Sequence, residues 1–320
     1  MTDTVWCSDI GTSIRTSYDS EMPNVTVATG MTLEYETFGS PDDPAVLLVM
    51  GFTAQMTLWP VELCEGLAAG GRHVIRFDNR DCGLSTKLDG VEVDLGAAMA
   101  AAYSGQQVDG APYLLSDFAA DAIGLLDALG IGEAHILGAS MGGMIVQTMA
   151  IEYPARCLSM TSVMSTTGDL SVGQAAPEAM SALLTPPPTD RQGFIDAAPT
   201  GLVFASKKYR NADEAKARAA LAYDRSFYPQ GAARQLVAIL ASGDRSARLP
   251  GVTVPTLVIH GCDDTLIDKS GGLQTAELIP GANLLLVADM GHDLPLPLLP
   301  IIVDAVLSHT AHAAEFAHAS

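Results

Sequence analysis

Apolar runs of five to seven residues alternate with longer amphipathic segments along most of the chain. The runs hold few polar residues, which is typical of strands buried on both faces of a parallel sheet. Helix-period segments follow most of the runs and predict the crossover helices that join parallel strands. The runs lie at residues 45–50, 73–77, 134–138, 157–163, 256–261 and 282–287.

Two short alternating segments near the start, residues 24–28 and 31–38, flank Thr29-Gly30 and predict an antiparallel hairpin. With it the predicted sheet has eight strands. The clearest predicted helix covers residues 116–129, with Ser116 as its N-cap and Gly130 as its stop. Further helices are expected from near residue 60 and at 97–103, 141–153, 272–278 and 300–309, and the tail from residue 310 is expected to be frayed.

The alternation stops between residues 166 and 249. Helix-like stretches follow one another there without strands, at residues 178–184, 212–223 and 231–242. We therefore predict a helical cap at residues 166–249, inserted between two parts of one core at 1–165 and 250–320. The predicted fold class is α/β, with a doubly wound, mostly parallel eight-stranded sheet and a helical cap.

The turn after the run at 134–138 reads Gly138-Ala139-Ser140-Met141-Gly142, a Gly-x-Ser-x-Gly pattern between a predicted strand and a predicted helix. In that context the pattern predicts a nucleophile elbow, in which a strained turn exposes a serine hydroxyl. The N-terminus of the following helix would place partial positive charge where an oxyanion forms. A glycine-rich turn with an incidental serine is the alternative.

A serine hydroxyl becomes a nucleophile when a base takes its proton and a carboxylate orients that base. In a sheet of this kind, the acid and then the histidine are expected on loops after later strands. His292 lies in such a loop, and we expect Gly291 to let the backbone turn the His292 ring toward Ser140. A purely structural role for His292 is the alternative. Asp263 and Asp264 both follow an earlier strand, and spacing alone does not choose between them.

The loop after residues 45–50 is the expected source of a second oxyanion donor. Gly51 permits close approach of the backbone, so the amides of Phe52 and Met141 are the candidate oxyanion hole. The charged segment at 78–85 is interpreted as a loop braced by an Arg–carboxylate pair. Candidate substrate-binding residues are large apolar side chains near the elbow and in the cap, with ordinary core packing as the alternative: Met50, Trp59, Met144, Tyr223 and Phe227.

The formal net charge is −20, from 37 acidic and 17 basic residues. Such a surface repels phosphate backbones and anionic lipids, so we expect no nucleic-acid or membrane partner. No apolar run reaches the length of a membrane span, and the first residues lack the pattern of a signal peptide. Five scattered cysteines without a Cys-x-x-Cys pattern predict free thiols, no metal site and a cytoplasmic protein. A homodimer is compatible with the sequence.

From about residue 25 to residue 309 the chain resembles the α/β-hydrolase fold superfamily. The resemblance implies Ser140, Asp264 and His292 as a catalytic triad, and it selects Asp264 over Asp263. It rests on motifs in family order: Gly138-Ala139-Ser140-Met141-Gly142, Asp78-x-Arg80-x-x-Gly83-x-Ser85, Gly261-x-x-Asp264 and Gly291-His292.

Three further segments, residues 47–51, 59–60 and 73–81, look like the aclacinomycin methylesterase branch of that superfamily, which cleaves a methyl ester from a polyketide. The usual His-Gly before the oxyanion loop is Met50-Gly51 here, as in that branch. The cap shows no such match, and a cap carries much of an enzyme's substrate choice.

The residues predict a serine hydrolase that cleaves carboxylic esters of uncharged, fairly apolar small molecules through an acyl-enzyme, without a metal or organic cofactor. A polyketide methylesterase, a carbon–carbon bond hydrolase and a perhydrolase are alternatives with the same triad. Dehalogenases and epoxide hydrolases of this fold need a carboxylate where Ser140 stands. A ligand-binding protein of the same fold is the alternative outside enzymes.

Overall fold

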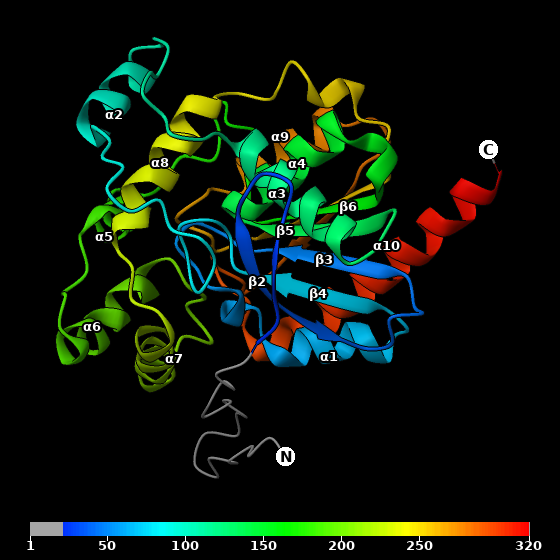
Figure 1. The fold of residues 1–320 in the computed structure, drawn as a ribbon, viewed down its shortest axis with the longest axis horizontal. Coiled ribbons are helices and arrows are strands. Elements are labelled where there is room, and N and C mark those ends of the chain that lie inside the picture. The colour runs from blue at the N-terminus through cyan, green and yellow to red at the C-terminus, as the bar shows by residue number, and fades with distance from the viewer. Residues whose placement is uncertain (1–21, 320) are drawn as a thin grey trace.

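The computed structural model describes residues 22–319, with side chains through residue 313, and has the predicted α/β architecture (Figure 1). Its eight-stranded sheet has the order β1-β2-β4-β3-β5-β6-β7-β8. β2 pairs antiparallel with β1 and β4, and the other pairings are parallel. The strands are β1 (Asn24–Thr26), β2 (Thr32–Phe38), β3 (Ala45–Val49), β4 (His73–Phe77), β5 (Ala134–Ala139), β6 (Cys157–Val163), β7 (Thr256–Gly261) and β8 (Asn283–Val287).

Helices cover both faces of the sheet (Figure 1). One face carries α1 (Val61–Ala69) and α10 (Leu299–Ala319), and the other carries α3 (Leu115–Ala128), α4 (Met141–Glu152) and α9 (Ser270–Leu278). Further helices gather beyond one end of the sheet (Figure 1). One of them, α2 (Leu95–Tyr103), lies between β4 and β5 in the chain. The others lie between β6 and β7, where the chain has no strand: α5 (Pro177–Leu184), α6 (Arg191–Ala197), the 3₁₀ helix η3 (Ala198–Val203), α7 (Ala212–Arg225) and α8 (Gln230–Ser242).

Two hydrophobic cores lie on the two faces of the sheet, and the alternation of side chains along β3 feeds both. Leu47 and Val49 pack with α3 and α4, whereas Val46 and Leu48 pack with α1 and α10. All four are almost completely buried. Full burial of each such side chain contributes about 1.5–3 kcal/mol, so β3 and its helices form a rigid base for the loops at the carboxyl ends of the strands.

Two local predictions were wrong, and one helix was missed. Ser116 is not the N-cap of α3, because Leu114 occupies that position and the Asp117 carboxylate accepts a hydrogen bond from its amide at 2.7 Å. The tail from Thr310 is not frayed, since α10 continues to Ala319 and Thr310 and Ala313 are buried. The sequence pattern also gave no signal for α6.

One helical window, Leu296–Ala313, is apolar and long enough to cross a membrane by length and composition, contrary to the expectation from the sequence. Leu299, Ile302 and Val306 of this window instead lie in the hydrophobic core beside α1. α10 is therefore placed as a core helix of the folded domain.

The cap is fastened to the core by buried ion pairs at the loop after β4. Arg225 of α7 lies 2.7 Å from Asp78, and Arg234 of α8 forms two bonds to Asp81, at 2.8 and 2.9 Å. Arg80 of the same loop pairs with a third carboxylate, Asp121 of α3, at 2.7 Å. The loop is braced by Arg–carboxylate pairs, and each partner comes from a distant helix.

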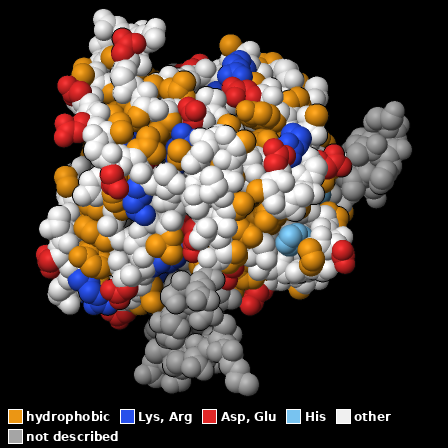
Figure 2. Space-filling view, in the orientation of Figure 1, with side chains coloured by type: hydrophobic (Ala, Val, Ile, Leu, Met, Phe, Trp, Pro, Cys, Tyr) orange, Lys and Arg blue, Asp and Glu red, His pale blue; other side chains and the backbone are white. Residues whose placement is uncertain are grey.

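The surface carries its acidic side chains spread over the visible face, with a few basic ones among them (Figure 2). Among the described residues, Cys82, Cys157 and Cys262 are free thiols. Cys7 lies outside the described residues, as does the start of the chain on which the signal-peptide expectation rests.

Candidate active site

Ser140 stands at the sharp turn between β5 and α4, with φ 58° and ψ −121°. This left-handed conformation strains a non-glycine residue, and such strain persists where the surroundings hold it. Glycines on either side make the turn possible, because a Cβ on Gly138 would collide with Gly142 and one on Gly142 would collide with the carbonyl of Val49. The turn thus leaves the Ser140 hydroxyl part-exposed at the carboxyl edge of the sheet.

Three side chains from three loops meet at this edge in a hydrogen-bonded series. His292 Nε2 lies 2.9 Å from Ser140 Oγ, and His292 Nδ1 lies 2.7 Å from Asp264 Oδ2. An ionised carboxylate only accepts, so Nδ1 carries the ring proton and Nε2 accepts from the serine hydroxyl. Asp264, and not Asp263, is the carboxylate in contact with His292.

Asp264 is held ionised. Burial alone would raise its pKa, but the attraction of His292 and the hydrogen bonds from His260 and His292 outweigh burial and lower the pKa to about 2. Its other oxygen, Oδ1, accepts the amides of Leu266 and Ile267, both at 2.9 Å. The carboxylate is therefore fixed in position and in charge.

The loop after β3 brings a second backbone segment against the serine. A Cβ built on Gly51 would lie 3.0 Å from Ser140 Cβ and 3.1 Å from the Ala139 carbonyl, so glycine permits this close approach. Within residues 22–319, the amides of Phe52 and Met141 donate to no other part of the chain. Met141 is also the first residue of α4, where helix N–H groups have no partner inside the helix.

A cap segment that the sequence gave no sign of lies directly on His292. The Phe204 carbonyl accepts the His292 amide at 2.7 Å, and the two rings stand edge to face with centroids 6.2 Å apart. Gly291 is needed for a different reason than expected, because a Cβ there would collide with the backbone at Ala205 and Ser206. The positive φ in this loop belongs to Asp289, not to Gly291.

Asp293 ties the same two segments together. Its carboxylate accepts the Ser206 amide at 2.9 Å and the Gly291 amide at 3.2 Å. Burial of this carboxyl raises its pKa. The histidine loop and the cap are therefore joined through backbone and side chain.

The predicted substrate-binding residues fall into two groups. Met50, Trp59 and Met144 lie in the two hydrophobic cores and are 4%, 1% and 8% exposed. Tyr223 and Phe227 stack on one another in the cap, with centroids 4.6 Å apart. Their part in binding a substrate stays a prediction.

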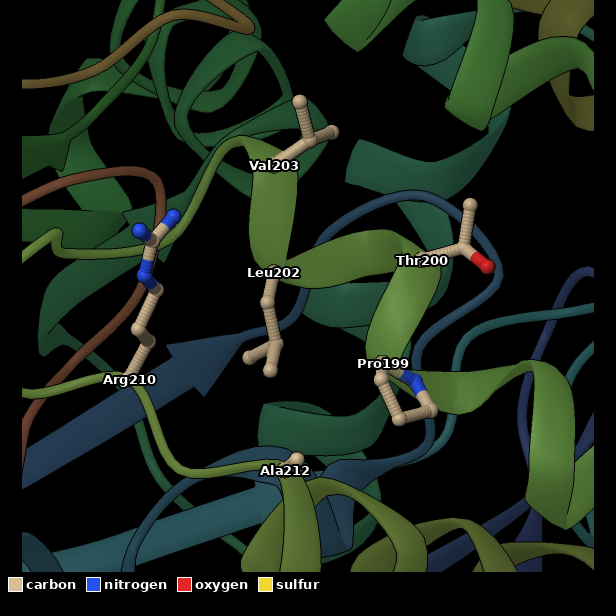
Figure 3. A pocket seen from close by; sticks show the side chains of 6 residues that line it. All are labelled: Pro199, Thr200, Leu202, Val203, Arg210 and Ala212. Carbon is tan, nitrogen blue, oxygen red and sulfur yellow. The ribbon is translucent and has the colours of Figure 1, made fainter.

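A cavity of about 550 Å³ lies in the cap between η3 and the start of α7. Figure 3 shows Leu202 pointing from η3 toward Ala212, with Arg210 along one side. Val203, which lines the cavity, directly precedes Phe204, the residue that contacts His292. The cavity is lined by Pro199, Thr200, Leu202, Val203, Arg210 and Ala212.

Within the part of the chain that the structure describes, no group of three or more His, Cys, Asp or Glu side chains is arranged to hold a metal ion. His260 is the residue near the site that sequence reasoning passed over. Its Nε2 lies 2.8 Å from the Ile267 carbonyl and 3.5 Å from Asp264 Oδ2. The sequence offered one signal for a role of His260, because this residue lies four positions before Asp264 at the end of a predicted strand.

A wound sheet with a serine elbow and a histidine–carboxylate pair at its carboxyl edge defines the class of hydrolases built on such a sheet. The chain belongs to the alpha/beta hydrolase fold family, whose family model matches residues 44–297. The expected fold and resemblance are thereby confirmed.

Several relatives are named as hydrolases or esterases. Rhodomycin D methylesterase DnrP of Streptomyces peucetius is 29% identical over 309 residues, covering 88% of this chain and 96% of its own. A 2-hydroxymuconate semialdehyde hydrolase of Pseudomonas putida is 30% identical over 202 residues, covering 59% and 66%. The enol-lactonase of Burkholderia xenovorans LB400 shares the fold, with a TM-score of 0.67 at 21% identity over 90% of this chain and 100% of its own.

Proposed function

We propose that the chain is a serine carboxylesterase that acts on uncharged, fairly apolar esters. The observation that carries the proposal is the series from Ser140 Oγ through His292 to Asp264, at 2.9 and 2.7 Å. A nucleophile within hydrogen-bond reach of a base, itself oriented by a carboxylate, is the arrangement that acyl transfer requires. The amides of Phe52 and Met141 supply the proposed oxyanion hole beside it.

In the proposed reaction, Ser140 Oγ attacks the ester carbonyl carbon while His292 Nε2 takes the hydroxyl proton. The carbonyl oxygen becomes an oxyanion and accepts the amides of Phe52 and Met141. The bond to the leaving alcohol then breaks, and His292 returns its proton to that alcohol. Water cleaves the acyl-enzyme by the same route, while the ionised Asp264 stabilises the imidazolium in both halves.

The substrate class is argued from the cap. The open pocket between η3 and the start of α7, whose residue Val203 precedes Phe204 in the chain, is lined mainly by apolar side chains, which supports an apolar acyl or alcohol group. Similarity to a methylesterase over most of the chain supports methyl esters among the substrates. The free thiols of Cys82, Cys157 and Cys262 support a reducing compartment, and we place the protein in the cytoplasm on that ground.

The test uses p-nitrophenyl esters of short and long acids, with methyl esters in parallel. The wild-type protein is expected to release p-nitrophenol with a burst, and Ser140→Ala is expected to abolish release. Ser181→Ala, an exposed serine of α5, is the matched control and is expected to keep full activity. Ester turnover that survives Ser140→Ala would rule out the proposed nucleophile, and binding of esters without turnover would support a ligand-binding protein.

Carbon–carbon bond hydrolysis is the second candidate, because the 2-hydroxymuconate semialdehyde hydrolase is a relative at 30% identity. The same serine, histidine and carboxylate serve that reaction in this fold. The two candidates are separated by comparing kcat/KM for 2-hydroxymuconate semialdehyde, followed by its absorbance, with kcat/KM for the best ester. A higher value for the semialdehyde would replace the esterase proposal.

A further inference from the structure

The proposed oxyanion loop contains a residue in an unfavourable conformation. Thr53, which follows Phe52, has φ 56°. The Ala54 amide bonds to the Gly51 carbonyl at 3.3 Å, so Thr53 is the third residue of a four-residue turn. Turns with a positive φ at that position favour glycine or asparagine, and a β-branched residue there is an outlier. Something outside the loop must therefore hold Thr53.

The outside support comes from the cap. Gln235 of α8 is completely buried, and its Oε1 accepts the Thr53 amide at 2.8 Å. Its Nε2 donates to the Arg80 carbonyl at 2.9 Å, which fixes the orientation of the side-chain amide. The Cys82 thiol donates to the Thr53 carbonyl at 3.2 Å, so Thr53 is held on both sides.

The position of Thr53 bears on the Phe52 amide because one Cα separates the two peptide groups. Release of the Thr53 amide would free the Phe52–Thr53 peptide to rotate, and the turn that directs the Phe52 N–H would relax with it. Oxyanion donors are useful only when fixed in advance at about 2.7–3.1 Å from the developing charge. A relaxed loop would thus bind an ester but stabilise its oxyanion less.

We propose that Gln235 is a positioning residue for the oxyanion hole, so that the cap completes the active site of the core. The inference rests on the proposed function. It assigns to α8 a role in the chemical step, distinct from contact with the substrate.

The test replaces Gln235 by Met, which keeps the shape of the side chain and removes both hydrogen bonds. We expect kcat for a p-nitrophenyl ester to fall about tenfold to hundredfold, less than complete loss of a donor, with KM changed by no more than about twofold. The inhibition constant of a phenylboronic acid, whose adduct with Ser140 carries an oxygen in the hole, is expected to rise by the same factor.

Ser242→Ala is the matched control on the same helix. Ser242 accepts the Leu115 amide at 2.8 Å and so attaches α8 to α3 without touching the oxyanion loop. We expect its kcat to stay within about twofold of wild type. Equal kcat losses for Ser242→Ala and Gln235→Met would show that any loosening of α8 has this effect and would overturn the specific role of Gln235.

Thr53→Gly provides a second measurement, because glycine takes the positive φ without support. In that background Gln235→Met is expected to lower kcat by less than about threefold, so that the two substitutions are coupled. Additive effects would overturn the proposal. If Gln235→Met does not fold, Gln235→Leu takes its place in the same cycle, since it also removes the acceptor of the Thr53 amide.

The proposal and the proposed function fail in different ways. An active wild type that Ser140→Ala inactivates, together with an unchanged kcat in Gln235→Met, removes only the role of Gln235. A wild type without ester turnover removes the proposed function itself.

Discussion

Loss of the Arg234 guanidinium is expected to destabilise the protein far more than loss of a comparable surface pair. Arg234 and Asp81 have side chains 5% and 0% exposed and are joined by two hydrogen bonds. Burial alone would raise the pKa of Asp81, but the bonds from Arg234, Tyr113 and Leu88 lower it, so the carboxylate is ionised. Arg234→Met therefore leaves a buried charge without its cation.

The magnitude follows from what Asp81 keeps. Breaking a buried pair by removing one partner costs about 3–5 kcal/mol. The Tyr113 hydroxyl at 2.6 Å and the Leu88 amide at 2.8 Å still donate to Asp81, which places the expected cost near the lower end, about 3 kcal/mol.

The matched pair is Arg191 and Asp224 on the cap surface, with side chains 50% and 53% exposed. It also has two hydrogen bonds, at 2.6 and 2.7 Å, but water screens it, so Arg191→Met is expected to leave the stability nearly unchanged. Both pairs have two hydrogen bonds and differ in burial, although Arg234 also donates to the Val91 carbonyl and the Tyr228 hydroxyl, which adds to the cost of its loss.

Urea unfolding followed by circular dichroism measures both costs. Arg234→Met is expected to lower the midpoint strongly and Arg191→Met hardly at all. Adding Asp81→Asn to Arg234→Met removes the unpaired charge and is expected to restore part of the loss. Equal costs for the two arginines, or a double variant less stable than Arg234→Met alone, would refute the reasoning.

Three further outcomes are expected. Asp264→Asn lowers kcat by on the order of 10⁴, because the imidazole of His292 loses the acceptor that orients it. The control Asp263→Asn leaves ester kinetics nearly unchanged. Similar losses of kcat in both variants would reject Asp264 as the carboxylate of the triad. Gly51→Ala pushes the oxyanion loop off Ser140 and lowers kcat at least about tenfold, whereas Gly132→Ala, with open space around its Cβ, does not, as steady-state kinetics will measure. Burial lowers the pKa of His135 from 6.5 to about 4, so the unfolded chain binds this proton first. The free energy of unfolding is therefore highest above pH 6.5 and falls by about 3 kcal/mol as the pH is lowered to 4. Urea unfolding at several pH values measures this loss. If the urea midpoint of His135→Gln falls with pH as much as that of the wild type, the reasoning is contradicted.

The sequence predicted the sheet well because each strand carries its own signal. The runs at 73–77, 157–163 and 256–261 match β4, β6 and β7 residue for residue, since strands buried on both faces are largely apolar. The nucleophile elbow was also predicted from local sequence, because glycines and a serine at this spacing, placed after a strand and before a helix, favour this turn. These features depend on neighbours in the chain.

Most of the failures depend on partners far away in the sequence, whereas the N-cap of α3 was missed through the local contact of Asp117 with Leu114. Nothing near Asp78 indicates that its cation is Arg225, or that Gln235 will bond to Thr53 across 182 positions. The stop of α10 was misplaced because Thr310 and Ala313 are buried against the rest of the fold, which no local pattern reveals. The part of the predicted substrate-binding side chains in binding stays a prediction.

The buried contacts of α7 and α8 with two core loops also bear on the engineering of this protein. A cap grafted from a relative would lack the partners of Asp78, Asp81 and Thr53. The resulting chimera would be expected to misfold or to be inactive even with an intact nucleophile. Libraries aimed at new substrates would do better to vary η3 and the start of α7 while leaving Arg225, Arg234 and Gln235 untouched. Over evolutionary time, the same constraint would require cap and loops to change together.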